Sequence, residues 1–379
     1  MIFMKSAVSL LSSSLASHPA SFRSLCSRLV MLCSLVFGVM SCNRPPEKLQ
    51  FFPSHHLGIQ YIGRLNFSDS TKPVFWQPGV QVNFTFSGDS CGIILQDEQL
   101  WGTSHNYIQL VVDSLEKRIR LVNAIDTIWL RGKTGTTTHQ VSIIKNTEAN
   151  IGYIAVKGVI ARELLAPPAL KQRKIEFIGN SITCGMGSDT SDIPCGKGQW
   201  YDQHNAAKSY GALTATALNA RYHLSSVSGI GLMHSCCGMK ITMPQVFNKI
   251  SMHNDSLPWN FALYQPDLVS ICLGQNDGVQ DSVVFVNNYI RFLKQLRTYY
   301  PKAQFICITS PMADDQLRTF LKNALAAVVL QLHQDGDQLV DRFIFENQYT
   351  AGCDFHPSLS EHRLIAEQLT AFIRQKMKW

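Results

Sequence analysis

The chain has 379 residues, of which 45% are hydrophobic and 16% are charged, and its formal net charge is +7. This composition suffices for one large hydrophobic core or two ordinary ones, and it excludes a chain that is disordered throughout. No run of Lys and Arg has the density of a nucleic-acid-binding surface, so the sequence predicts neither nucleic acid nor a charged membrane surface as a partner.

Residues 1–42 have the layout of an export signal. Arg23 and Arg28 precede an apolar run over 29–40, which is too short to cross a bilayer comfortably and ends in "VMSC". This ending resembles a bacterial lipobox, in which the cysteine, here Cys42, is lipidated after cleavage. We therefore predict a signal peptide with a lipobox and an exported protein, which is periplasmic, a lipoprotein of the outer membrane, or secreted. A plain signal peptide or a short core helix is the alternative.

The segment 50–165 alternates between apolar and polar residues in short runs, such as "VQVNFTFSG", "YIQLVVDS" and "HQVSIIKN", separated by Gly, Asp, Asn and Ser. A period of two, repeated about every ten residues without a long helical stretch, predicts an antiparallel sandwich or jelly roll. "LLAPPALKQRK" follows, and its two prolines make it a plausible linker.

The segment 172–379 has a different rhythm. Apolar strand candidates, "KIEFIG", "YHLSSVSG", "DLVSICLG" and "QFICITS", alternate with helix-like segments. Nearly continuous apolar strands between helices predict a parallel sheet covered on both faces, that is, a three-layer α/β/α domain. Ligands of such domains lie beyond the carboxyl ends of the strands.

Polar residues gather at those predicted strand ends and in a late loop. The four blocks are "GNS" at 179–181, "SGIG" at 228–231, "GQND" at 274–277 and "CDFHPS" at 353–358. Each block has a structural alternative: a helix cap for "GNS", a turn for "ND", and a structural role for a lone histidine. All four in this order, each at a strand or loop end, favour a catalytic site.

Ester hydrolysis by nucleophilic attack needs a hydroxyl, a base and donors to the oxyanion. Ser181 supplies the hydroxyl, and His356 supplies an imidazole whose ordinary pKa lies near neutrality. The backbone N–H groups of Ser181 and Gly229 and the side-chain amide of Asn276 are the predicted oxyanion donors.

The four blocks resemble the SGNH (GDSL-type) hydrolases, with Ser181, Gly229, Asn276 and His356 as the hallmark residues. The front half, with "GRLNF", "VFWQPGVQVNFTFSG" and "HQVSIIKNTEANIGYIAVKGV", narrows the resemblance to carbohydrate esterase family two, which joins a jelly roll to an SGNH domain. The resemblance implies an exported deacetylase that removes O-acetyl groups from polysaccharides such as xylan or mannan. It implies neither a metal nor an organic cofactor.

The last block departs from the SGNH pattern. SGNH hydrolases usually carry an aspartate three residues before the histidine, and here Cys353 stands at that position, with Asp354 one residue later. Two interpretations stay open: Asp354 is the third member of a triad, or Ser181 and His356 form a dyad in which a backbone carbonyl orients the imidazole. The first block also carries Asn180 where Asp is commoner, and we expect little effect from that change.

Other residues carry weaker predictions. Phe355 and Trp200 are candidate substrate-binding aromatics, and Tyr201 is a further one, whereas Trp259 is expected in the core and Asp277 in a turn. Eleven cysteines suit an exported protein. Cys184 and Cys195 flank a polar loop and could close it as a disulfide, while Cys272 and Cys307 are expected as buried packing residues. Without a CxxC pair and with scattered histidines, no zinc site is predicted.

We thus predict a serine esterase acting on acetylated polysaccharide or oligosaccharide through Ser181, His356 and an acyl-enzyme. One alternative is an esterase for another acyl ester, such as a lipid or a host glycan. The other is a carbohydrate-binding protein without activity.

Overall fold

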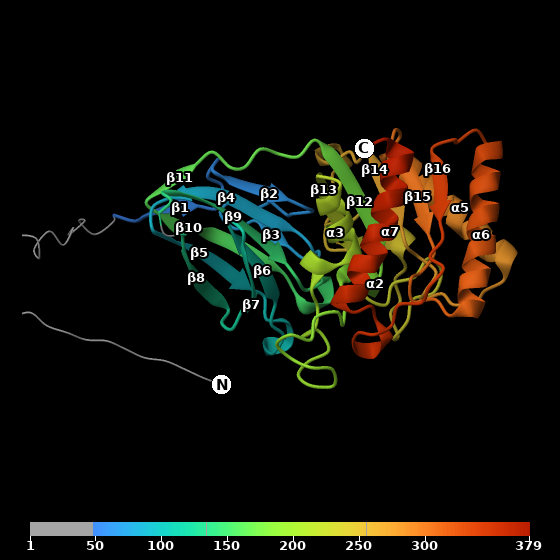
Figure 1. Ribbon diagram of the computed structural model, residues 1–379, viewed down its shortest axis with the longest axis horizontal. Coiled ribbons are helices and arrows are strands. Elements are labelled where there is room, and N and C mark those ends of the chain that lie inside the picture. The colour runs from blue at the N-terminus through green and yellow to red at the C-terminus, as the bar shows by residue number, and fades with distance from the viewer. Residues whose placement is uncertain (1–47, 134, 255) are drawn as a thin grey trace, which may run out of the picture. The chain divides into compact units, whose positions relative to one another are not determined.

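The computed structural model describes residues 48–379 except 134 and 255, and these residues form one compact unit (Figure 1). The predicted signal peptide and Cys42 lie outside the described residues. Among the helices of the described part, none is both long and apolar enough to cross a membrane.

The front half is built from two antiparallel sheets, as the alternating pattern predicts. One sheet contains, in order, β1 (Gln50–Pro53), β10 (Ile154–Ala161), β5 (Ser90–Asp97) and β8 (Ile125–Arg131), and β3 (Val74–Phe75) also pairs with β10. The other contains β11 (Glu163–Leu165), β4 (Gln81–Ser87), β9 (Thr138–Lys145), β6 (Tyr107–Val112) and β7 (Leu115–Arg120), and β2 (Ile59–Ile62) pairs with β4. Their inner faces share one apolar core, in which Phe84 and Ile93 are fully buried. The all-β prediction is confirmed, and we call this half the sandwich.

The back half contains a sheet of five parallel strands. Their order is β13 (Ala220–Ser226), β12 (Arg173–Gly179), β14 (Leu268–Ile271), β15 (Gln304–Ile308) and β16 (Val340–Phe343). All residues of β14 and β15 are buried, which explains their continuous apolar sequence. The edge strand β16 has only one buried residue, and the sequence pattern did not single it out.

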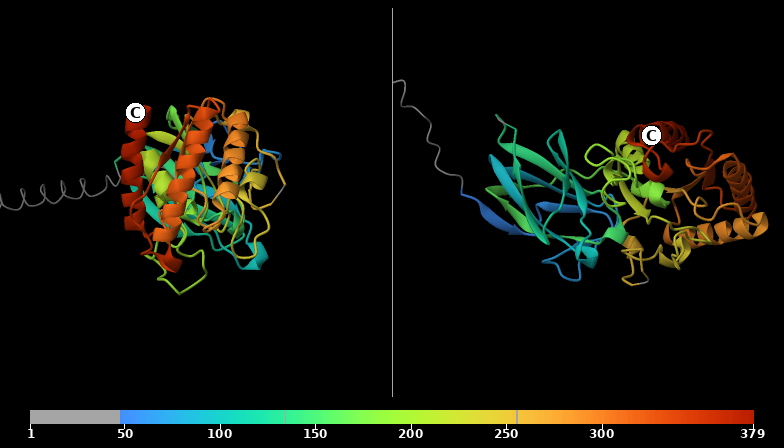
Figure 2. Two further views of the ribbon diagram at one scale, coloured as in Figure 1. Left: turned by 90° about the vertical axis from the view of Figure 1, so that its right-hand side faces the viewer. Right: turned by 90° about the horizontal axis from the view of Figure 1, so that it is seen from below.

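Helices cover both faces of this sheet (Figure 2). On one face, α3 (Tyr210–Ala217) and α7 (Leu359–Met377) share a core with Phe177 of β12. On the other, α5 (Ser282–Tyr299) and α6 (Asp315–Gln334) share a core with Ile271 of β14. Short helices are α2 (Ser181–Cys184) and α4 (Met243–Val246), and 3-10 turns are η1 (Leu100–Gly102), η2 (Ala149–Ile151), η3 (Ala206–Lys208), η4 (Phe261–Leu263) and η5 (Cys353–Phe355). The predicted three-layer α/β/α domain is confirmed.

A buried ion pair joins the sandwich to the strand that leads to Ser181. Nη2 of Arg64 lies 2.8 Å from Oε1 of Glu176 on β12, and both side chains are at most 1% exposed. Arg64 also donates to the carbonyl of Lys249, and the hydroxyl of Tyr300 donates to Glu176. Because every charged group here has partners, the pair fixes β12 against the sandwich without leaving a lone buried charge.

Candidate active site

Ser181 is the first residue of α2, and only Asn180 separates it from the end of strand β12. The side chain that caps this helix is that of Asn180, whose Oδ1 accepts from the N–H of Ile182 at 3.1 Å. The helix ends after one turn at Gly185, where φ is +71°, a conformation that favours glycine. The Ser181 hydroxyl is therefore not used as a cap and is free for another contact.

That contact is with His356, on the loop before α7. Nε2 of His356 lies 2.8 Å from Oγ of Ser181, and Nδ1 lies 2.8 Å from the main-chain carbonyl oxygen of Asp354. A carbonyl oxygen can only accept, so Nδ1 carries the proton and Nε2 accepts the hydroxyl proton of Ser181. Burial lowers the pKa of His356 below its usual value, and the hydrogen bond to the Asp354 carbonyl partly offsets this effect. In this arrangement the unprotonated Nε2 of the imidazole faces the hydroxyl of Ser181.

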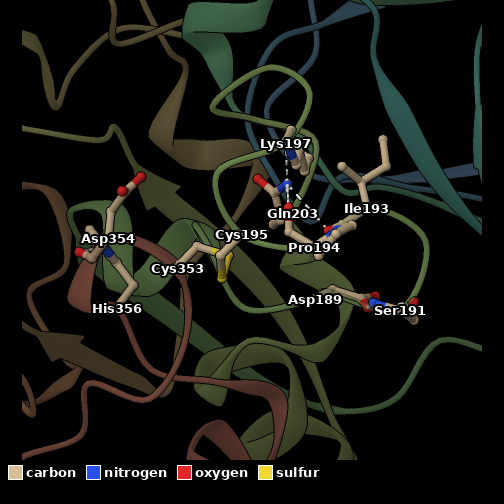
Figure 3. The surroundings of a disulfide bond; sticks show 10 residues. All are labelled: Asp189, Ser191, Ile193, Pro194, Cys195, Lys197, Gln203, Cys353, Asp354 and His356. Atoms are coloured by element: carbon tan, nitrogen blue, oxygen red, sulfur yellow. Dashed lines mark hydrogen bonds between the residues drawn. A yellow bond between two sulfur atoms is a disulfide. The ribbon is translucent and has the colours of Figure 1, made fainter.

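The structure brings the main chain of Asp354, not its carboxylate, to the imidazole. The side chain of Asp354 is exposed, and Figure 3 shows its carboxylate directed away from the ring of His356. The backbone bends sharply here, since φ is +50° at Asp354 and +58° at Phe355. This bend turns the carbonyl toward Nδ1. Of the two interpretations left open by the sequence, the geometry matches the dyad, in which a backbone carbonyl orients the imidazole.

The blocks at 228–231 and 274–277 are connected to each other by a hydrogen bond. Nδ2 of Asn276 donates to the carbonyl of Ile230 at 2.8 Å, which leaves the second amide hydrogen of Asn276 for a further acceptor. Gly229 has φ of +82°, and a Cβ at this position would lie 2.9 Å from the sulfur of Cys236. The neighbouring Asp277, expected in a turn, accepts from three successive N–H groups. They belong to Leu232, Met233 and His234.

The sandwich contributes a buried carboxylate that the sequence analysis missed. Glu148 accepts from the N–H of Ser228, next to Gly229, at 2.5 Å and from the thiol of Cys184 at 3.2 Å. Its Oε1 lies 3.9 Å from Nε2 of His204. Burial alone would raise the pKa of Glu148, but His204 and these donors outweigh burial and lower it. The sequence offered one weak signal for this residue: Glu148 is an acidic residue in a stretch whose pattern otherwise predicts a strand and a turn.

The predicted disulfide between Cys184 and Cys195 is wrong. Cys195 is bonded to Cys353, 158 residues away (Figure 3). Cys184 is a buried free thiol. The sulfur of Cys184 instead lies 3.2 Å from a carboxylate oxygen of Glu148 and 3.2 Å from the hydroxyl oxygen of Ser226. Its single hydrogen can be donated to one of these two oxygens at a time. A second disulfide joins the adjacent residues 236 and 237.

The remaining predicted residues fall into two groups by exposure. Phe355 and Trp200 are 79% and 43% exposed, as a substrate-flanking role requires, whereas Tyr201 is buried. Trp259 is buried against His223, as expected of a core residue. Trp101, for which the sequence predicts no role, is 88% exposed on the 3-10 turn η1 of the sandwich.

Two further predictions concern buried thiols and metals. Cys272 and Cys307 are buried free thiols, as predicted from their apolar runs. Within the described residues, no group of three or more His, Cys, Asp or Glu side chains is arranged to hold a metal ion.

Comparison with known proteins places this arrangement in a family. Residues 61–168 match the family described as "Carbohydrate esterase 2 N-terminal", and residues 177–364 match the "GDSL-like Lipase/Acylhydrolase family". The chain is 30% identical to a solved family two carbohydrate esterase from Clostridium thermocellum in complex with cellohexaose. The two structures superpose with a TM-score of 0.76, and the match covers 85% of this chain and 100% of the solved one.

Two characterised relatives agree with this. The cellulase/esterase CelE of Acetivibrio thermocellus is 32% identical over 85% of this chain, which spans only 40% of the length of that relative. An acetylxylan esterase / glucomannan deacetylase of Cellvibrio japonicus is 28% identical over 85% of this chain and 89% of its own length. The chain belongs to family two of the carbohydrate esterases.

Proposed function

We propose that this chain is a serine esterase that removes O-acetyl groups from polysaccharides of the xylan or mannan type. The observation that carries the proposal is the 2.8 Å contact between Nε2 of His356 and Oγ of Ser181 at the carboxyl edge of the parallel sheet. A buried, neutral imidazole in this contact is a competent general base for a serine nucleophile.

The reaction proceeds in two steps. Oγ of Ser181 attacks the acetyl carbonyl carbon while His356 takes the hydroxyl proton. The bond between the carbonyl carbon and the sugar oxygen breaks, and His356 returns the proton to that oxygen. Water then attacks the acetyl carbon of the acetyl-enzyme while His356 takes a proton from it. The bond between this carbon and Oγ breaks, His356 returns the proton to Oγ, and acetate leaves. The N–H groups of Ser181 and Gly229 and the amide of Asn276 stabilise the oxyanion in both steps.

Support for a polysaccharide substrate comes from the surroundings of the pair and from the relatives. Phe355 follows the carbonyl that orients His356 and exposes its ring, and Trp200 lies on the long loop after Ser181. Exposed aromatic faces suit the apolar patches of sugar rings. The relatives include an acetylxylan esterase / glucomannan deacetylase and an esterase solved with cellohexaose.

We also propose that the protein is exported, as its first 42 residues predict. Two disulfides within the described residues support an oxidising compartment. The divisions at 1–42, 50–165 and 172–379 and the lipid anchor at Cys42 remain predictions.

The test is acetate release from acetylated xylan and acetylated glucomannan, with 4-nitrophenyl acetate as a small substrate. We expect release from all three by the wild type. Activity on 4-nitrophenyl esters of longer acyl chains but not on acetylated polysaccharide would favour another acyl ester. Binding of xylan without hydrolysis of any ester would replace the proposal with a carbohydrate-binding role.

A further inference from the structure

We propose that the Cys195–Cys353 disulfide is a positioning device for His356, which holds the carbonyl of Asp354 against the imidazole. This inference rests on the proposed function, because it assigns a supporting role in the same site. Cys353 stands three residues before the histidine, where the SGNH pattern has its aspartate. In this chain a covalent bond to a distant loop occupies that position.

The segment that the disulfide restrains has an unfavourable backbone conformation. Asp354 and Phe355 are consecutive residues with positive φ, a conformation that is unfavourable for residues with a Cβ atom. The same bend aims the Asp354 carbonyl at Nδ1 of His356. Relaxation of either residue toward ordinary φ would rotate this carbonyl away, and the imidazole would lose its orienting acceptor.

Main-chain hydrogen bonds stabilise this bend, but most of them join residues within the segment 352–356. The N–H of Gly352 donates to the carbonyl of His356 at 2.7 Å, and the N–H of His356 donates to the carbonyl of Cys353 at 3.0 Å. One main-chain bond leaves residues 352–356: the N–H of Cys353 donates to the carbonyl of Gly187 at 2.8 Å. The disulfide adds a covalent link at the same residue, to the middle of the loop that follows Ser181.

That loop, residues 186–205, is itself well fixed. The side-chain amide of Gln203 is buried, and the two hydrogens on its Nε2 are shared among three carbonyls on both sides of Cys195. These belong to Ile193 at 3.3 Å, Pro194 at 3.2 Å and Lys197 at 3.0 Å (Figure 3). A single side chain therefore closes the turn that carries Cys195, so that the disulfide ends on an ordered segment.

The sandwich anchors the same loop from outside. Nη2 of Arg118, on β7, donates to the carbonyls of Asp202 at 2.6 Å and His204 at 3.0 Å. The hydroxyl of Tyr107, on β6, donates to the carboxylate of Asp202 at 2.9 Å. The sandwich thus holds the loop after Ser181, and through Cys195 and Cys353 it restrains the segment that orients His356.

A disulfide that closes a loop of this length would also stabilise the fold in general, by restricting the unfolded chain. The two roles differ in what they predict for folded protein. A purely stabilising bond lowers the melting temperature when it is removed and leaves the rate constant unchanged below that temperature. A positioning bond lowers kcat in protein that is still folded.

The test compares Cys195→Ala, Cys353→Ala and the double variant on 4-nitrophenyl acetate, well below each melting temperature. We expect each single variant to lose about 10- to 100-fold in kcat with little change in KM, because a small misplacement of a catalytic group has this effect. The double variant should lose no more than either single one, because all three lack the same bond. Leu332→Ala, in the buried core of α6, controls for stability and should keep wild-type kcat. Wild-type kcat in the folded single variants, or a double variant that loses the product of both single losses, would overturn the inference.

A second measurement uses the unaltered protein in case a variant does not fold. Dithiothreitol gives two electrons and two protons to each disulfide, which becomes two thiols, and itself closes to a cyclic disulfide. Samples are alkylated at intervals, mapped by mass spectrometry and assayed. Activity should fall as Cys195–Cys353 opens. Full activity with this bond open, loss that follows only Cys236–Cys237, or a wild type whose Cys195 and Cys353 are free thiols would overturn the inference.

Labelling of Ser181 by a small fluorophosphonate separates this inference from the proposed function. Oγ forms a bond to phosphorus, fluoride leaves, and His356 takes the proton, so the labelling rate reports on the imidazole whatever the natural substrate is. Slower labelling of the variants supports the inference even if no acetyl ester is hydrolysed. Equal labelling with intact ester hydrolysis would overturn the inference and leave the proposed function in place.

Discussion

The two members of the proposed dyad are held in different ways. Ser181 follows a regular strand, its helix is capped by the preceding residue, and Gly185 ends that helix four residues later. His356 lies on an irregular segment with two positive φ values, which is bonded to a cysteine 158 residues away. Local sequence places the nucleophile, whereas contacts between distant parts of the chain place the base.

The largest effect should come from the locally placed member. Ser181→Ala removes the nucleophile, and we expect kcat on 4-nitrophenyl acetate to fall by about 10⁴-fold or more. Ser360→Ala, on the exposed start of α7, should keep wild-type activity. If Ser181→Ala keeps even a tenth of the activity, Ser181 is not the nucleophile and the comparison of the two members has no basis.

The difference between the two members also decides what could be predicted. Strand β12, the capped turn and Ser181 are consecutive in the chain, so periodicity and capping rules predict them together. The parallel sheet and the sandwich follow from apolar patterns of the same local kind. The disulfide partner of Cys195 could not be predicted from local patterns. Spacing in sequence favoured Cys184, and only the folded chain brings Cys353 close to Cys195. Glu148 was missed for the same reason: its partners, Ser228 and Cys184, come from the other half of the chain.

Even the regular strand depends on a distant contact, and the next largest effect tests this. Arg64→Gln leaves Glu176 buried without its cation, and we expect a loss of about 3–5 kcal/mol in the free energy of unfolding. Chemical denaturation measures this loss. Arg64→Gln with Glu176→Gln removes both charges and should cost clearly less. Equal costs for the single and the double variant would mean that the charge pair does not hold β12 to the sandwich.

The oxyanion donors rank next. Asn276→Ala removes one proposed donor, and kcat should fall about 10²- to 10³-fold with a smaller change in KM. The same variant loses the hydrogen bond to the carbonyl of Ile230, so its melting temperature must be measured as well. Asn287→Ala, on the exposed face of α5, is the control. A kcat within about threefold of the wild type would remove Asn276 from the site.

The pH dependence tests the environment of His356. Burial lowers the pKa of this imidazole below the usual value near 6.5. A general base acts in its neutral form, so kcat/KM should rise with pH and reach half its plateau below about pH 6.5. The profile on 4-nitrophenyl acetate between about pH 4 and 8 measures it, with the fold checked by circular dichroism at each pH. A midpoint at or above about pH 7 would contradict a buried base in the free enzyme.

The smallest effect should come from the carboxylate of Asp354, and it separates the dyad from the triad most directly. The carbonyl, not the carboxylate, faces Nδ1, and asparagine tolerates the positive φ at this position. Asp354→Asn should therefore keep kcat within about twofold of the wild type, and Asp354→Gly should do the same, because both preserve the main-chain acceptor. In a triad whose histidine is oriented by an aspartate, the change to asparagine costs about 10⁴-fold in kcat. A loss of that size would mean that the carboxylate turns to the imidazole in the working enzyme, and that the base, like the nucleophile, is oriented by a side chain next to it in sequence.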